Sequence, residues 1–421
     1  MKFVLASYGT RGDVEPCVAI GRELLHRGHE VRMAVSPDQV GFAGSVGLSA
    51  VAYGPDTRHW QEVHRSLLTR ISRRFWRFKE LRGLVREDWK LLRHLWEDSN
   101  RVLLSLAEEA DVLFTGVLGE QSAANVAQYH EIPLATLHTY PMRPNSQLNP
   151  MLPAPLARSA MKASEWVAWK LTKRLDDEQR RELGLSKATE PTSQRITDRR
   201  SLELQAYEEV FFPELTAEWA PFAGHRPIVG ALTLELPGDD DDEASAWIAA
   251  GTPPIFFGFG SMPVRSAAET LSMISKACAQ LGERALVGSG WTDFSDIPHH
   301  DNVKVVGTLN YASTFEGCSA VVHHGGLGTT TAGLRAGVPS LILWTWADQR
   351  LWGARVKRLK LGTARRFTAT SPQTLITDLR TILDPQYVAR AREIARQVSK
   401  PGESVTAAAD LMEDLALSRV D

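Results

Sequence analysis

The chain has 421 residues, of which 43% are hydrophobic and 23% are charged, and its formal net charge is −2. This length exceeds what one ordinary core holds and predicts two domains of about 200 residues each. The charge balance excludes a globally basic nucleic-acid binder. Three well-separated cysteines (Cys17, Cys278 and Cys318) form no CxxC motif, which indicates reduced thiols in the cytoplasm. No apolar run approaches the roughly 18 residues of a membrane span.

The first fifty residues predict a β-α-β unit. Residues 2–7 (KFVLAS) and 31–35 (VRMAV) are β-prone runs on either side of a Gly-rich turn and a helical pattern. We expect Pro16 in the first turn of that helix, and Gly28 just past its end. A helix-sized connection between two strands favours parallel pairing in a doubly wound sheet, which residues 134–140 would continue.

The turn that opens this helix, GTRGDVEP (9–16), contains a candidate catalytic acid. Asp13 could simply complement the positive end of the helix dipole. Alternatively, its carboxylate could act as a general base, since a carboxyl group of ordinary pKa near 4 is ionised at neutral pH. Arg11 is either a solvated turn residue or part of the same site. The residues leave both choices open.

Three segments in the middle of the chain stand out by composition. Between residues 65 and 93 there are ten Lys or Arg and three acids, interleaved with Trp and Phe. This segment predicts a basic amphipathic helix or helix pair, either a surface helix with its aromatics in the core or a docking face for anionic membrane or a lipid-linked acceptor. Residues 141–170 predict a long functional loop and a helix. The charged segment 173–200 is expected to be partly mobile.

The pattern of strands and Gly turns restarts after residue 250. Strands are predicted at 254–261, 284–290, 302–307, 319–324 and 340–344, with a helix at 267–281. We therefore predict an α/β protein with two Rossmann-like domains facing across a cleft, with ligands at the carboxyl ends of the strands. The domains are placed at 1–232 and 251–400. A linker spans 233–250, and a C-terminal helix at 401–421 is expected to pack back on the N-terminal domain. The acidic run Asp239 to Asp242 is interpreted as solvated linker and helix N-cap rather than as a metal site.

The most informative stretch is VVHHGGLGTTTAGLRAGVP (321–339), a strand followed by a Gly-rich turn and a helix. This geometry suits an anion, because backbone N–H groups and the positive helix end face it. A purely structural turn is the alternative. The chain has no GK dipeptide for a Walker A motif, and neither turn contains GxGxxG. Zinc is disfavoured because the adjacent histidines, His323 and His324, point to opposite faces of a strand.

This stretch, followed by WADQ (346–349) and combined with GTRGDVEP, resembles the family-1 glycosyltransferases of GT-B fold. The branch it resembles includes sterol glucosyltransferases and the glycosyltransferases of glycopeptide antibiotics and mycobacterial glycopeptidolipids. The resemblance spans nearly the whole chain. It implies that the C-terminal domain binds a nucleotide-sugar donor, that the N-terminal domain binds the acceptor, and that Asp13 is the general base.

The resemblance also implies roles for individual residues. His324 and the glycine turn would hold the pyrophosphate, Asp348 and Gln349 would bond the sugar, Ser261 would reach the β-phosphate, and Trp291 and Leu309 would lie near the base. The full implied donor site is Arg11, Gly12, Ser261, Trp291, Leu309, His324, Gly325, Gly326, Gly328, Thr329, Asp348 and Gln349. No metal and no cofactor are expected.

The expected function is therefore inverting, metal-independent transfer of a hexose or deoxyhexose. The donor would be a UDP- or dTDP-sugar, and the acceptor a hydroxyl of a hydrophobic molecule such as a glycopeptidolipid, a sterol, or another lipid or natural product. The protein would be cytoplasmic, with peripheral contact to the inner face of the membrane through 65–93, and would bind no nucleic acid. The alternatives are a nucleotide-sugar epimerase or hydrolase, and a non-catalytic protein that binds nucleotide-sugar or lipid.

Overall fold

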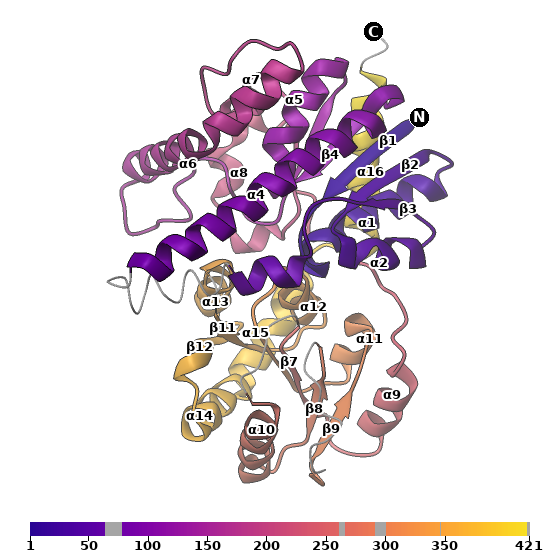
Figure 1. Cartoon of the computed structure of the whole chain (residues 1–421). Helices are drawn as coiled ribbons and strands as arrows, with labels where there is room; N and C mark the ends of the chain where they lie inside the picture. The colour runs from indigo at the N-terminus through magenta and orange to yellow at the C-terminus, as the bar shows by residue number, and fades with distance from the viewer. Residues whose placement is uncertain (64–77, 261–265, 291–299, 346, 419–421) are drawn as a thin grey trace. The chain divides into compact units, whose positions relative to one another are not determined.

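The computed structural model describes residues 1–63, 78–260, 266–290, 300–345 and 347–418 (Figure 1). The chain divides into two compact units. Unit 1 comprises residues 1–207, 214–232 and 402–421, and unit 2 comprises 208–213 and 233–401. Each unit is built on its own six-stranded sheet.

The sheet of unit 1 has the order β3-β2-β1-β4-β5-β6, and every pairing between its strands is parallel. Its strands are β1 (Lys2–Ser7), β2 (Glu30–Val35), β3 (Ser49–Ala52), β4 (Val112–Gly116), β5 (Leu134–His138) and β6 (Leu202–Gln205). The chain winds outward from β1 in one direction and from β4 in the other. The carboxyl ends of these two central strands therefore form a topological switch point, the usual ligand position in such sheets.

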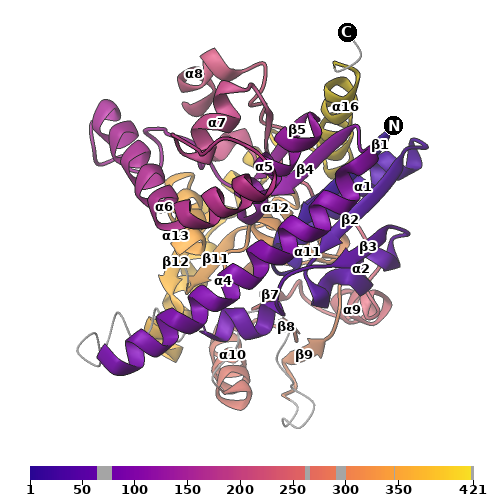
Figure 2. The same ribbon diagram turned by 45° about the horizontal axis from the view of Figure 1, so that its top comes forward.

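Helices cover both faces of this sheet (Figure 2). Its main helices are α1 (Arg11–His26), α2 (Val40–Ser45), α4 (Phe78–Leu106), α5 (Glu120–His130), α6 (Ala154–Glu182), α7 (Thr192–Asp198), α8 (Leu215–Glu218) and α16 (Pro401–Leu417). Leu95 and Leu103 anchor α4 in a core cluster with Val4 and Ala6 of β1. The C-terminal helix α16 packs beside α1, where Arg27 pairs with Asp410 and Glu413 at 2.7 Å each (Figure 1).

The first helix begins earlier than expected. It starts at Arg11, so Pro16 lies inside it rather than in its first turn, and that part of the prediction was wrong. The reason is local hydrogen bonding, because Asp13 at the third helical position accepts the backbone N–H of Thr10 and starts the helix there. The other end was predicted correctly, since Gly28 follows the last turn with a φ of +84°.

Unit 2 repeats this topology, with the order β12-β11-β10-β7-β8-β9 and parallel pairing throughout. Its strands are β7 (Ile255–Gly258), β8 (Ala285–Gly288), β9 (Val303–Val306), β10 (Ala320–His323), β11 (Ser340–Trp344) and β12 (Gly362–Arg366). Its main helices are α9 (Asp241–Ala249), α10 (Ala267–Leu281), α11 (Tyr311–Glu316), α12 (Leu327–Arg335), α13 (Ala347–Arg358), α14 (Pro372–Ile382) and α15 (Pro385–Ala395). The switch point lies between β7 and β10.

A short piece of the first half of the chain belongs to unit 2. Residues 208–213 leave unit 1, contribute to unit 2 and return. Buried Glu208 accepts hydrogen bonds from Arg335 and Ser399 at 2.9 Å. Phe211 packs edge-on against Trp352 of α13, with ring centroids 5.2 Å apart. Nothing in the composition of this segment predicts the excursion, because its partners lie more than 120 residues away in the sequence.

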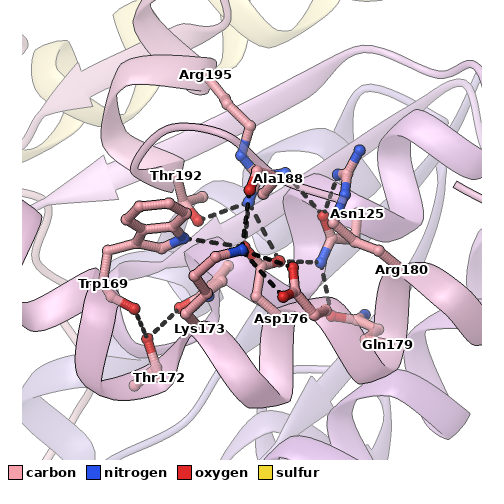
Figure 3. Close-up of polar contacts among 12 residues, drawn as sticks. Asn125, Trp169, Thr172, Lys173, Asp176, Gln179, Arg180, Ala188, Thr192 and Arg195 are labelled. Carbon is pink, nitrogen blue, oxygen red and sulfur yellow. Dashed lines mark hydrogen bonds and ion pairs between the residues drawn. The ribbon is translucent and has the colours of Figure 1, made fainter. Parts of the chain in front are cut away.

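Two compositional predictions have different outcomes. Residues 173–200 do not form a mobile stretch. They complete α6 and form α7, and Asp176 there is fully buried among polar partners (Figure 3). Several of its charged side chains pair with one another, as Arg195 does with Asp176 and Lys173 with Asp177, which the sequence alone did not reveal. In the acidic run, Asp240 is the N-cap residue of α9, and Asp241 accepts the N–H groups of Gly238 and Asn310 at 2.8 and 2.7 Å. Residues 65–77 of the basic segment 65–93 lie outside the described residues, and residues 78–93 form the first part of the predicted helix, as α4.

Candidate functional site

In unit 1, the turn between β1 and α1 lies at the switch point and presents Asp13. The Asp13 side chain is exposed, and its Oδ2 accepts the backbone N–H of Thr10 at 2.9 Å and the Thr10 hydroxyl at 3.2 Å. Ser7, at the end of β1, donates to the Asp13 carbonyl at 2.8 Å. Gly9 has a φ of +146°, and a Cβ there would overlap the Asp13 carboxylate. The turn therefore holds one carboxylate in a defined position at the carboxyl edge of the sheet.

The neighbours of Asp13 have separate roles in this structure. Arg11 donates to Glu15 at 3.0 Å, and its guanidinium lies 4.5 Å from the centre of the Phe42 ring. Its side chain is about half exposed, at 51%. Arg11 is therefore turned along the helix toward Glu15. Gly12 is exposed, and a side chain there would meet no atom within 4 Å, so the turn does not need glycine at that position for space.

In unit 2, the two adjacent histidines lie at the end of β10 in different environments. His323 is fully buried, and its Nδ1 accepts the backbone N–H of Gly325 at 3.1 Å. His324 is half-buried, and its ring lies between Gly260, which follows β7, and Gly326. The two ring planes are 89° apart. His323 therefore supports the glycine turn from within, while His324 lies beside it at the switch point.

Burial also sets the protonation of these rings. Burial, together with the neighbouring His324, lowers the pKa of His323 to about 3. Burial also lowers the pKa of His324, to about 4. Both imidazoles are therefore neutral at pH 7 in the unliganded protein. A neutral His324 can still donate one N–H to an anion, and a bound diphosphate would favour its protonated form.

The turn after His324 has the shape of an anion site. Gly325 is buried with a φ of +93°, and a Cβ there would lie 2.7 Å from Cγ2 of Ile342. Gly326 is the N-cap residue of α12, so the N–H groups of the first turn of that helix have no partner within the helix. Gly328 is exposed and Thr329 is half-buried within this first turn. Thr330 points back and donates to the Gly326 carbonyl at 2.8 Å.

The segment after the next strand, β11, adds two more predicted residues, Asp348 and Gln349. Gln349 is buried, and its Oε1 accepts the N–H of Thr345 at 2.8 Å. Its Cβ would lie 3.2 Å from a Cβ on Gly325, so α13 packs directly on the glycine turn. Asp348 is exposed in the first turn of α13. Leu309 packs at the edge of a separate core cluster with Phe256 and Phe315. Ser261 and Trp291 lie outside the described residues.

Sequence reasoning missed a buried ionic cluster near the same edge of unit 1. Glu120, at the start of α5, bonds His138 at the end of β5 at 2.6 Å, and Arg143 at 2.9 Å. Arg143 also binds Glu203 of β6, which pairs with Arg226 at 2.6 Å. Burial favours the neutral form of Glu120, but its interactions with Arg143 and His138 outweigh this effect and hold the pKa of Glu120 at about 2. A signal was present, because His138 stands at the end of an apolar strand, but its partners are too scattered to form a motif.

The described part of the chain has neither a metal-binding cluster nor a helix suited to span a membrane. Among those residues, no group of three or more His, Cys, Asp or Glu is arranged to hold a metal ion. In the same residues, no helix combines the length and hydrophobicity that a bilayer span needs.

Family models match both halves of the chain. Residues 3–90 match the glycosyltransferase family 28 N-terminal domain, and residues 265–412 match the erythromycin biosynthesis protein CIII-like C-terminal domain. An uncharacterized glycosyltransferase of Mycobacterium tuberculosis is 53% identical to this chain over 418 residues, which cover 99% of each protein. A sterol 3-beta-glucosyltransferase of Arabidopsis thaliana is 27% identical over 434 residues, which cover 97% of this chain and 67% of that protein.

Solved structures share the fold. The glycotransferase of kitacinnamycin superposes with a TM-score of 0.67 at 18% identity, over 98% of each chain. The glycosyltransferase VinC, solved in complex with dTDP, superposes with a TM-score of 0.63 at 18% identity, over 99% of this chain and all of that one. At these identities the likeness establishes the architecture, including the two sheets with their switch points.

Proposed function

We propose a specific sugar transfer for this chain, which belongs to the family-1 glycosyltransferases of GT-B fold. The donor is a UDP- or dTDP-sugar carrying a hexose or deoxyhexose, and the acceptor is a hydroxyl of a hydrophobic molecule. One observation carries the proposal. The turn at the switch point of each sheet supports it, because that turn carries the Asp13 carboxylate in unit 1 and opens the N-terminus of α12 in unit 2.

The donor diphosphate is assigned to the turn between β10 and α12. The N–H groups at the start of α12 and the positive end of its dipole suit a diphosphate, and His324 adds an N–H donor. The sugar is assigned to Asp348 and Gln349, which open α13 next to Gly325. VinC, a relative in fold, was solved with dTDP, which supports a nucleoside diphosphate as the leaving group. Ser261, Trp291 and Leu309 complete the assignment near the β-phosphate and base, with Arg11 and Gly12 on the side of unit 1.

Asp13 is proposed as the general base. The acceptor oxygen attacks C1 of the sugar from the face opposite the nucleotide, the new C1–O bond forms, and the bond from C1 to the phosphate oxygen breaks. The acceptor proton passes to the Asp13 carboxylate, and the nucleoside diphosphate leaves with the electron pair. This single displacement inverts the anomeric centre. The hydrogen bond from the Thr10 N–H holds the carboxylate in place for the transfer.

The leaving diphosphate is proposed to be stabilised without a metal or cofactor. In this proposal the backbone N–H groups of α12 and the His324 imidazole do what a cation does elsewhere. These groups are part of the fold and need little reorganisation when the negative charge develops. The reaction is proposed to take place in the cytoplasm.

The acceptor is proposed to be lipid-like. One relative is named as a sterol 3-beta-glucosyltransferase. Helix α6 of unit 1 presents several exposed apolar side chains, including Leu156, Trp166 and Leu171, which are 59%, 51% and 69% exposed. Such a surface suits a hydrophobic acceptor or the lipid that carries it. Peripheral contact with an anionic membrane through 65–93 is part of the same proposal, and glycopeptidolipids, sterols and other lipids or natural products are the acceptors it covers.

Measurement of released nucleotide tests the proposal. The purified protein is incubated with UDP-glucose, dTDP-glucose or dTDP-rhamnose, with and without a panel of sterols and glycolipids. Release that depends on acceptor, with glycosylated product of inverted anomeric configuration, is expected. Equal release with and without acceptor would indicate hydrolysis, nucleotide-sugar interconversion would indicate an epimerase, and binding without turnover would indicate a non-catalytic protein. Each of these three results would replace the proposed transfer.

A further inference from the structure

A cavity in unit 1 lies at the opposite edge of its sheet from Asp13. Its volume is about 310 Å³. Leu134 begins β5, Ser201 directly precedes β6, and Leu415 comes from the last turns of α16. All three line the cavity at the amino ends of the strands, whereas the β1–α1 turn lies at their carboxyl ends. The cavity is therefore separate from the switch point of unit 1 and lies within that unit.

Among the described residues, the wall of this cavity carries cations and no carboxylate. Its lining includes three arginines, Arg195, Arg199 and Arg200, from the end of α7, together with Gln128 and two serines. The rest of the lining is aliphatic, and among these residues Ile132, Leu134 and Ile196 are buried. Arg199 and Arg200 are exposed, which places guanidinium groups toward solvent around an apolar interior. We call this cavity the arginine pocket.

One of the arginines is held rigidly (Figure 3). Arg195 donates to both oxygens of buried Asp176, at 3.2 and 3.0 Å, and to Asn125 at 2.9 Å. Its remaining nitrogen, Nε, is buried and has no hydrogen-bond partner among the described residues. A buried N–H of a charged group without a partner is costly, and a ligand or water would relieve that cost.

Positive charge around the pocket exceeds the available carboxylates. Arg180 lies behind Gln128 and donates to its side chain at 3.1 Å. Asp176 pairs with Arg195, while Arg180, Arg199 and Arg200 form ion pairs with no carboxylate in the described ranges. Burial and the neighbouring Arg195 lower the pKa of both Arg180 and Arg199. In the described part of the chain the four guanidinium groups thus form one ion pair with a carboxylate, and Asp177 adds a weaker attraction to Arg180. An anion would offset their mutual repulsion.

We propose that the arginine pocket binds a small organic phosphate or carboxylate. The anionic group is held by Arg199 and Arg200, whose planar guanidinium groups match both anions. The apolar part of the ligand rests on Leu134, Ile196 and Leu415. The volume is at the lower end of the range for small-molecule sites, about 300–1,000 Å³. This site is independent of the proposed transfer, because it shares no residue with either switch point.

Phenyl phosphate and phenylacetate are suitable probes, with benzyl alcohol and inorganic phosphate as controls. Calorimetry is run on the full chain in the presence of saturating UDP, so that a probe cannot be bound through a nucleotide site. At least one aromatic anion is expected to bind with a Kd below about 1 mM, and its affinity should fall when salt is added. Benzyl alcohol and inorganic phosphate are expected to bind at least about tenfold more weakly, because each lacks one half of the ligand.

Two variants and a control assign the binding to this pocket. The double substitution Arg199→Gln/Arg200→Gln should weaken the probe by about tenfold or more, the effect of losing charged hydrogen bonds. Leu415→Trp should weaken it as well, by filling the pocket from α16 without removing a charge. Arg174→Gln changes an arginine on α6 that is 84% exposed and does not line the pocket, and should leave the affinity unchanged.

Several results would overturn the proposal. These are the absence of binding by both anions in the presence of UDP, equal binding of inorganic phosphate or benzyl alcohol, and unchanged affinity in the double variant. Because the readout is binding rather than turnover, a failure here leaves the sugar-transfer proposal standing. Conversely, a protein without transferase activity could still bind the probe.

Discussion

Acid should destabilise the glycine turn of unit 2 through His323, and one substitution can isolate this effect. In the folded protein His323 is buried, and its Nδ1 accepts the N–H of Gly325. Protonation at Nδ1 would place two donors face to face at 3.1 Å and would put a charge in the core. The substitution His323→Asn removes the titrating ring, while its side-chain oxygen can occupy nearly the same position as Nδ1 and accept the same N–H.

The expected size follows from proton linkage. The unfolded chain protonates this histidine below about pH 6.5, whereas the folded protein does so only near pH 3. Between these values the unfolded state binds more protons, so the free energy of unfolding falls as the pH falls. From pH 7 to pH 5 the loss due to this ring is about 2 kcal/mol, at about 1.4 kcal/mol per pH unit below the unfolded pKa.

Urea unfolding of the wild type and the variant at pH 7 and pH 5 measures the difference. His323→Asn should lose about 2 kcal/mol less than the wild type between the two pH values. His323→Leu provides the matched comparison. It should show the same reduced pH dependence but be less stable at both pH values by about 1–3 kcal/mol, because the buried Gly325 N–H loses its acceptor. Equal pH dependence in the wild type and both variants would refute a neutral, buried His323.

Gly325→Ala should destabilise unit 2 by about 1–3 kcal/mol and abolish UDP or dTDP binding, because alanine at a φ of +93° is strained and its Cβ crowds Ile342. Wild-type nucleotide affinity in calorimetry would contradict the assigned turn. Arg143→Met should cost about 3–5 kcal/mol in urea unfolding, since two buried carboxylates, Glu120 and Glu203, each lose their bond to this guanidinium. Adding Glu120→Gln should restore part of that loss, and an additive further loss would argue against direct pairing. EDTA should leave acceptor-dependent transfer largely intact, and complete loss restored by Mg²⁺ or Mn²⁺ would end the metal-independent scheme.

Eight of the twelve strands in the described part of the chain could be predicted, because each of them is a short, largely apolar run next to a turn. The other four were not predicted, and two of these, β6 (LELQ) and β12 (GTARR), are not apolar runs. In a parallel sheet covered on both faces, such runs are nearly continuous, as in residues 2–7 and 340–344. The helix at 267–281 was predicted to the residue, since Ser266 caps it and Gly282 ends it. The start of α1 was not, because Pro16 is also tolerated later in a helix whose cap is formed by Thr10 and Asp13.

Long-range pairing explains what the sequence could not indicate. Asp176 is neutralised by Arg195, and Glu203 by Arg143 and Arg226, each across a separation that no local pattern encodes. Composition alone therefore made 173–200 look mobile, although Asp176 and Arg180 within it are buried. The glycine turn was located correctly, yet the support of Gly325 by the ring of His323 required coordinates. Sequence reasoning had assigned His323 only to the opposite face of the strand.

Asp13 combines two roles that the sequence left as alternatives, and one pair of substitutions can separate them. Its carboxylate at the third position of α1 accepts the Thr10 N–H, which is half of a capping box. Glutamate is the acid most typical of that position, so Asp13→Glu should keep the helix start and change stability by less than about 0.5 kcal/mol. It also moves the carboxylate outward by one methylene. Since misplacement of about 1 Å can cost on the order of 10²-fold in rate, a base in this position should lose most of its activity.

Asp13→Asn makes the opposite test. The amide oxygen can still accept the Thr10 N–H, but an amide cannot take the acceptor proton, so transfer should fall by about 10²–10⁴-fold while UDP binding is retained. Acceptor-dependent turnover and urea unfolding are measured on both variants. If Asp13 only caps α1, both variants should turn over at nearly the wild-type rate, and any loss of activity should follow the loss of stability. If Asp13 is the base, both should be stable and slow, with Asn the slower of the two.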